Sequence, residues 1–155
     1  RHIQPLALLR RAASLFQHHA EQAGITLRIE GGEETDLIRV DEDRMMQVMD
    51  NLISNALRYT PQGGVVTLSV RQEDGRVNLL VEDTGSGIPP EELPHIFERF
   101  HRVDASRHPE SGGSGLGLAI VKALVEAQGG RVGAESDVGK GTRISLIFDA
   151  VGKSE

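Results

Sequence analysis

The sequence contains no cysteine and no tryptophan, and aromatic residues make up only 3% of its 155 residues. The absence of cysteine excludes disulfides and thiolate metal sites. No apolar run approaches the roughly 20 residues of a membrane-spanning helix, so a soluble chain is expected. The first residues do not form a signal peptide pattern. The net charge of −6 argues against a nucleic-acid surface, because such surfaces are basic.

Glycine is the abundant exception, with 18 residues where a typical share is about 7%. Many of these glycines fall between Gly85 and Gly141, which directs attention to backbone that bends sharply or approaches a ligand closely. The length fits one domain, and 38% hydrophobic with 26% charged residues is a globular composition.

Hydrophobic periodicity predicts three helices, a short helical turn and six strands. The helices are expected at 5–23, 42–59 and 115–128, the turn at 91–99, and the strands at 25–29, 37–40, 65–71, 76–82, 131–135 and 142–148. The strands at 65–71 and 76–82 form a hairpin around the turn sequence Glu73-Asp74-Gly75. Helices and hairpins in this order favour a two-layer α/β sandwich with a mixed β-sheet.

The helix at 42–59, which Asp41 can cap, has two different faces. One face is apolar and is expected in the core: Met45, Met49, Leu52, Ile53 and Ala56. The opposite face is polar: Gln47, Asn51, Asn55 and Arg58. A carboxamide oxygen suits Mg²⁺, and a guanidinium matches phosphate oxygens. Taken alone, however, this face also fits an ordinary solvated helix surface.

Two glycine-containing segments carry further chemistry. Asp83 ends a strand and is followed by Gly85 and Gly87, so its carboxylate could accept a hydrogen bond from an adenine amine, although a plain turn is the alternative. The run 112–118, Gly-Gly-Ser-Gly-Leu-Gly-Leu, leads into a helix and offers backbone amides to phosphate, although a structural turn is again the alternative. It matches neither a Walker A loop nor a Rossmann fingerprint.

The order of these motifs removes the ambiguity. An Asn-rich helix, Asp-Thr-Gly-Ser-Gly at 83–87, Ile-Phe-Glu-Arg-Phe at 96–100, the glycine run at 112–118 and Gly-Lys-Gly-Thr at 139–142 follow one another. This succession resembles the N, G1, F, G2 and G3 boxes of the catalytic domain of sensor histidine kinases, over about 5–148. The resemblance implies the Bergerat fold of gyrase, Hsp90 and MutL ATPases, with helices on one face of the sheet.

By the same resemblance, Asn55 is the Mg²⁺ ligand, Asn51 lies toward the phosphates and Arg58 stands where the family has Lys or Arg. The segment 101–111 corresponds to the ATP lid, anchored through Phe97 and Phe100. The catalytic set implied is Asn51, Asn55, Arg58 and Arg102, the last directed at the γ-phosphate. The remaining nucleotide-binding residues implied are Tyr59, Asp83, Gly85, Gly87, Ile88, Ser114, Gly115, Leu116, Gly117, Leu118 and Thr142.

The resemblance implies that residues 1–155 bind Mg-ATP and donate its γ-phosphoryl group to a histidine on a separate dimerisation domain, which the chain lacks. None of the six histidines lies in the usual acceptor setting. A cognate response regulator is an indirect partner. The fragment is expected to be monomeric and cytoplasmic. Its parent protein is expected to be a homodimer, and whether that parent is an inner-membrane receptor stays open.

Two alternatives remain. The first is an ATP-hydrolysing relative, in which the helix that resembles this Asn-rich helix carries Glu-x-x-x-Asn and the glutamate activates water. This chain has Asn51 four residues before Asn55, and Asp50 is rotated about 100° away. Negligible hydrolysis is therefore predicted. The other alternative is a nucleotide-binding module with degenerate chemistry.

Overall fold

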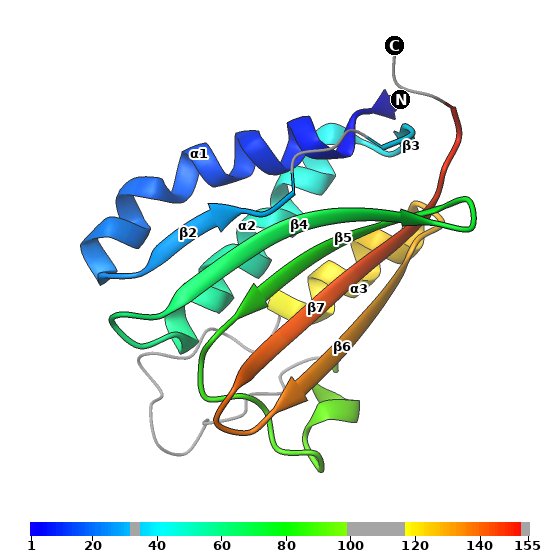
Figure 1. Cartoon of the computed structure of the whole chain (residues 1–155). Coiled ribbons are helices and arrows are strands. Elements are labelled where there is room, and N and C mark those ends of the chain that lie inside the picture. Colours follow the sequence, from blue (N-terminus) through cyan, green and yellow to red (C-terminus); the bar gives the residue numbers. More distant parts are fainter. Residues whose placement is uncertain (32–34, 99–116, 153–155) are drawn as a thin grey trace.

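The computed structural model describes residues 1–31, 35–98 and 117–152, and these form a helical layer on a mixed sheet (Figure 1). The sheet has the strand order β2-β4-β5-β7-β6, in which β2 and β4 are parallel and the other neighbours antiparallel. Its strands are β2 (Thr26–Ile29), β4 (Val65–Glu73), β5 (Arg76–Asp83), β6 (Arg131–Asp137) and β7 (Gly141–Asp149).

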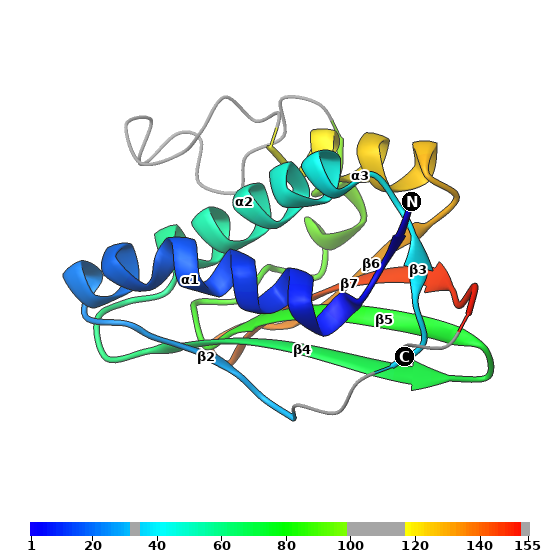
Figure 2. The ribbon, with the colours of Figure 1, turned by 90° about the horizontal axis from the view of Figure 1, so that it is seen from above.

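The three α-helices of the described residues cover the same face of the sheet (Figure 2). They are α1 (Pro5–Ala23), α2 (Glu42–Tyr59) and α3 (Gly117–Ala127). The predicted two-layer α/β sandwich with helices on one face is therefore confirmed. No helix within the described ranges is long and apolar enough to cross a membrane.

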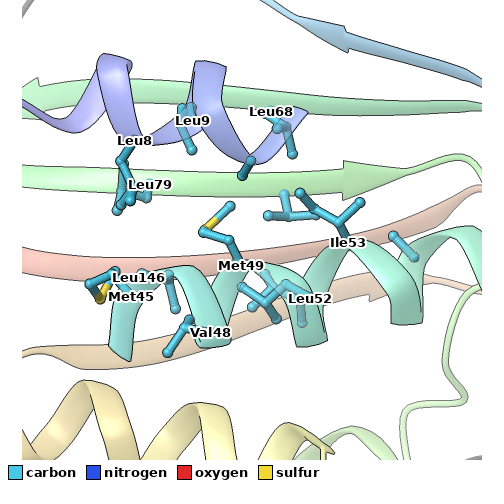
Figure 3. Packing of buried hydrophobic residues seen from close by; sticks show 14 of the residues in the cluster. Leu8, Leu9, Met45, Val48, Met49, Leu52, Ile53, Leu68, Leu79 and Leu146 are labelled. Atoms are coloured by element: carbon cyan, nitrogen blue, oxygen red, sulfur yellow. The ribbon is translucent and has the colours of Figure 1, made fainter. Parts of the chain in front are cut away.

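The central helix α2 begins where the sequence predicts, because the Asp41 side chain caps it by accepting the Arg44 N–H at 3.1 Å. Its apolar face packs onto the sheet beside α1 (Figure 3). The residues of that face are almost completely buried: Met45, Val48, Met49, Leu52, Ile53, Ala56 and Leu57. Burial of this stripe fixes the helix rotation, so the opposite polar face is directed away from the core.

Strand register places side chains of the four antiparallel strands in cross-strand rows. One helix-facing row is apolar and consists of Leu68, Val81, Ile144 and Ala134. The next row on the same face is Val66, Asp83, Thr142 and Ser136. The hydrophobic core thus gives way to polar side chains at the end of the sheet where β5 and β6 finish and β7 starts (Figure 1).

Several predicted boundaries are wrong. β4 continues to Glu73, so the hairpin turn is only Asp74-Gly75. In place of a helical turn over 91–99, the described residues form a single 3-10 turn, Leu93–His95. Pro94 explains this, since it lies inside the predicted turn and lacks a backbone N–H for a helical hydrogen bond.

Two short strands were not predicted as a pair, namely β1 (His2–Ile3) with β3 (Ile38–Arg39). The Val40 N–H donates to the Arg1 carbonyl at 2.9 Å, and the Val151 N–H donates to the Leu37 carbonyl at 2.9 Å. Residues 37–40 therefore hold both ends of the described chain together, at the end of the sheet opposite Asp83 (Figure 1).

Candidate functional site

Asp83 is the last residue of β5, and its carboxylate is half-buried. Oδ1 accepts the Gly85 N–H at 2.9 Å, and the carboxylate also accepts the Thr142 backbone N–H. Burial raises the pKa of Asp83, because removal from water disfavours the charge more than these two donors favour it. A partly desolvated acceptor of this kind interacts strongly with a ligand N–H.

The glycines after Asp83 are required by the protein's own packing. A Cβ on Gly85 would lie 2.5 Å from the carbonyl oxygen of Tyr59, at the end of α2. Gly87 has a φ of +79°, and a Cβ there would overlap the carbonyl oxygen of Asp137. The 85–87 loop is therefore held tightly between α2 and the β6–β7 turn. That these glycines also border a ligand stays a prediction.

Ser136 on β6 is a residue that the sequence analysis missed. Its Oγ accepts the Ile88 N–H at 2.7 Å, donates to the Gly141 carbonyl at 2.9 Å and lies 3.0 Å from the Thr142 hydroxyl. The Gly139 N–H also donates to the Ser86 carbonyl at 2.7 Å. The loop after β5 and the β6–β7 turn thus form one hydrogen-bonded unit. No local sequence pattern identifies Ser136, because its place opposite Thr142 depends on the register of the folded hairpin.

On α2, the side chains of Asn51 and Asn55 are half-buried and make no hydrogen bond with any residue that the structure describes. A Cβ on Gly117 would lie 4.0 Å from Asn51 Oδ1, so the described start of α3 lies beside this polar face. Arg58 is exposed and Tyr59 is half-buried near the end of the same helix. The structure therefore brings the Asn-rich face and the beginning of α3 together.

The carboxylate nearest to Asn51 in sequence faces elsewhere. Asp50 lines a groove of about 420 Å³ between α1 and α2, together with Ala12, Leu15, Phe16, Met46 and Gln47. Asn51 instead lies beside Gly117 of α3. The expected rotation of Asp50 away from Asn51 is confirmed, because the two residues border different neighbouring helices.

Other predicted site residues divide into described and undescribed ones. Ile88 and Leu118 are half-buried and pack against the core, as does Phe97 of the predicted lid anchor. The remaining predictions concern residues outside the described ranges: Phe100, Arg102, the lid at 101–111, Ser114, Gly115 and Leu116.

Within the ranges 1–31, 35–98 and 117–152, no group of three or more His, Cys, Asp or Glu could hold a metal ion. Neutral carboxamide oxygens are available on α2, where Asn51 lies beside the described start of α3 and Asn55 follows one turn later on the same helix. Mg²⁺ commonly takes only one or two protein oxygens and fills its other positions with water and phosphate oxygens. This donor set therefore fits a magnesium ion that arrives with a nucleotide.

The fold and this arrangement define a known class of ATP-binding domain. The family model of histidine kinase-, DNA gyrase B- and HSP90-like ATPases matches residues 40–152. The sensor histidine kinase WalK of Bacillus subtilis is 48% identical over 113 residues, which cover 72% of this chain and 18% of WalK. The sensor protein DivL of Caulobacter vibrioides is 50% identical over 123 residues, 79% of this chain and 15% of DivL.

Among solved structures, full-length ShkA in complex with AMPPNP superposes with a TM-score of 0.85 and 34% identity, over 98% of this chain and 32% of that one. The chain therefore belongs to the histidine kinase-, DNA gyrase B- and HSP90-like ATPase family, as a catalytic domain of the sensor histidine kinase type. It spans less than a third of the length of each of these three relatives.

Proposed function

We propose that this chain binds Mg-ATP and donates the γ-phosphoryl group to a histidine on a separate dimerisation and phosphoacceptor domain. The observation that carries the proposal is the convergence at one end of the sheet. There, the half-buried Asp83 carboxylate ends β5, Gly85 packs against the Tyr59 carbonyl at the end of α2, and the Asn51 carboxamide lies beside the start of α3. Family membership and the AMPPNP complex of ShkA support the same ligand.

In this proposal Asp83 accepts a hydrogen bond from the adenine amine. Its partial burial strengthens that bond, since less water competes for the carboxylate. Gly85 and Gly87 hold the adjacent loop in place, and Ile88 contributes an apolar surface toward the base. Thr142 lies directly across from Asp83 on β7 and supports the same end of the nucleotide.

The phosphates would lie where α2 meets the start of α3. Asn55 would hold Mg²⁺, which when bound neutralises charge on the phosphate oxygens. Asn51, beside Gly117, would orient the phosphates, and the exposed Arg58 would add positive charge. The phosphate contacts of the glycine run at 112–118, the γ-phosphate role of Arg102 and the lid at 101–111 belong to the same proposal.

The donor role follows from what α2 lacks. A hydrolase needs a general base near the terminal phosphate, and the carboxamide of Asn51 cannot accept a proton from water. Asp50 borders the α1–α2 groove instead. Bound ATP would therefore remain intact until an acceptor histidine approaches. WalK is a sensor histidine kinase and DivL a sensor protein, and no feature of the comparisons favours a gyrase-like or Hsp90-like hydrolase.

The partners and location are parts of the same proposal. The phosphoacceptor domain would be the direct partner, and a response regulator would receive the phosphoryl group from it. The chain would act as a monomeric cytoplasmic module of a homodimeric parent.

Transfer to a histidine can be measured directly by mixing this chain with the separately expressed phosphoacceptor domain of its parent kinase and ATP labelled at the γ-phosphate. We expect acid-labile, base-stable label on the acceptor. Asn55→Ala should abolish the labelling, whereas Asn78→Ala, a change on β5 toward the far end of the sheet, should not. Absence of label from the acceptor under conditions where the chain binds ATP would contradict the donor role.

A further inference from the structure

The polar row at the end of the sheet contains a hydroxyl pair whose hydrogen-bond direction can be assigned. Asp83, Thr142 and Ser136 are paired in register on β5, β7 and β6, and all three side chains belong to the helix-facing side of the sheet. Each is half-buried. The row directly behind them is apolar core, so few competing polar groups lie on that side.

A serine hydroxyl has one hydrogen to donate and two lone pairs to accept. The Ser136 hydrogen is used by the Gly141 carbonyl, at 2.9 Å. One lone pair accepts the Ile88 N–H, at 2.7 Å. The remaining contact, 3.0 Å to Thr142 Oγ1, must therefore be one in which Thr142 donates and Ser136 accepts.

This assignment changes what Thr142 can offer to a ligand. Since its only hydroxyl hydrogen is directed at Ser136, its Oγ1 presents lone pairs alone on its open side. The neighbouring Asp83 carboxylate is also an acceptor when ionised. The two groups together form an acceptor pair. Such a pair suits a purine edge that donates hydrogen bonds, either directly or through a bridging water.

We propose that Ser136 is a positioning residue that sets nucleotide selectivity, by holding the Thr142 hydroxyl as an acceptor and so favouring 6-amino over 6-oxo purines. A 6-oxo purine places a carbonyl oxygen where adenine has its amine, and that oxygen would face two acceptors. Without Ser136, the Thr142 hydroxyl could rotate and donate to the carbonyl oxygen. The inference rests on the proposed ATP site and adds the residue that fixes whether the Thr142 hydroxyl donates or accepts a hydrogen bond there.

ITP is the matched probe, because it has the ribose triphosphate of ATP but a 6-oxo group on the base. Calorimetric titration of this chain with each nucleotide, in the presence of Mg²⁺, gives the ratio of the Kd for ITP to the Kd for ATP. We expect Ser136→Ala to lower that ratio about fivefold, the effect of one altered hydrogen bond. Ser136→Thr keeps the hydroxyl and should retain the preference for ATP.

Ser145→Ala is the control, since Ser145 lies on β7 but, three residues from Thr142, on the opposite face of the sheet. It should leave both Kd values unchanged. If Ser136→Ala does not fold, Ser136→Cys takes its place. The same fall in the ratio of the Kd for ITP to the Kd for ATP is expected, because a thiol is a weak hydrogen-bonding group of similar shape.

The outcomes separate this inference from the proposed function. If the unmodified chain binds ATP no better than ITP, the adenine site itself is wrong and this inference fails with it. If the unmodified chain prefers ATP but Ser136→Ala weakens both nucleotides equally, Ser136 only supports the loop through Ile88, and the selectivity role alone is overturned.

Discussion

The Asp83 carboxylate lies where burial opposes its ionisation. Its carboxylate is half-buried, and burial raises its pKa despite the N–H donors of Gly85 and Thr142. A group in this condition lowers the stability of the free protein when it is ionised. The presence of a carboxylate here is understandable if it is needed for a ligand, because binding sites often contain polar groups that stability alone would not favour.

Replacing Asp83 with Asn should separate these two effects. We expect Asp83→Asn to weaken ATP binding about tenfold or more, because a hydrogen bond to a charged acceptor is lost. The free energy of unfolding without nucleotide should stay the same or rise at pH 7. Calorimetry and denaturant unfolding measure the two quantities. Asp149→Asn is the matched control, as Asp149 is exposed at the far end of β7, and it should leave ATP binding intact.

The raised pKa of Asp83 also predicts a pH dependence with a defined sign. Since the folded-state pKa lies above the unfolded value, the stability that Asp83 contributes is present below the unfolded pKa and is lost as the pH rises through the folded one. The amount by which Asp83→Asn raises the free energy of unfolding should therefore grow as the pH rises from the unfolded-state pKa to the folded-state pKa. ATP affinity of the unmodified chain should increase over the same interval. A stability difference that shrinks as the pH rises would show that the sign is wrong.

Single residues were predictable from sequence where a local pattern identified them. Asp83 ends a regular strand and precedes two glycines, so its place in a site could be proposed. Ser136 could not be identified in this way, since its role depends on hydrogen bonds to Ile88 and Thr142, which are brought to it by strand pairing and loop folding. The burial that raises the pKa of Asp83 is likewise a property of the folded protein.

Among the elements, α2 combines a structural and a functional face. Met49 on one side is completely buried against the sheet, whereas Asn55 on the other is half-buried and bonded to no described residue. The sequence predicted both bounds of this helix and most of its core face, because its cap and its period are local signals. The pairing of β1 with β3 was missed, since two-residue strands show no alternation.

Matched substitutions on α2 should separate its two faces. Met49→Ala should lower the free energy of unfolding by about 2–5 kcal/mol, through lost burial and a cavity. Asn55→Ala should change it by no more than about 0.5 kcal/mol, since no bond within the described protein is lost. Conversely, Asn55→Ala should remove the effect of Mg²⁺ on ATP affinity. Identical magnesium titrations of Asn55→Ala and the unmodified chain would refute the metal role.

The β6–β7 turn and the first residue of β7 offer a comparison between two glycines with positive φ. A Cβ on Gly141, at φ +134°, would overlap the backbone of Asp83, whereas a Cβ on Gly139, at φ +83°, would meet nothing within 4 Å. We expect Gly139→Ala to cost about 1 kcal/mol of unfolding free energy, the strain of its backbone conformation alone. Gly141→Ala should cost about 2 kcal/mol or more and weaken ATP binding, because β5 must move.

Equal unfolding free energies for Gly139→Ala and Gly141→Ala, measured in denaturant, would contradict the close approach of β7 to Asp83.

In the whole molecule, the two ends of the described chain and the candidate site lie at opposite ends of the sheet. Residues 37–40 join the N-terminal and C-terminal segments, while Asp83, Thr142 and Ser136 occupy the other end. The mixed sheet with helices on one face was predictable from the order of periodic segments. The meeting of the polar face of α2 with the start of α3 was predictable only through the family resemblance, since packing between distant segments leaves no local pattern.

The central claim is that this site binds ATP without a base that activates water, so that bound ATP stays intact until an acceptor histidine is present. The rate of phosphate release by this chain alone, at saturating Mg-ATP, tests it most directly. With Asn51 in place of a carboxylate and Asp50 directed toward α1, we predict release far slower than about 1 s⁻¹. Steady release at about 1 s⁻¹ or faster, within the usual range of enzymes, would identify the chain as a hydrolase and contradict the account.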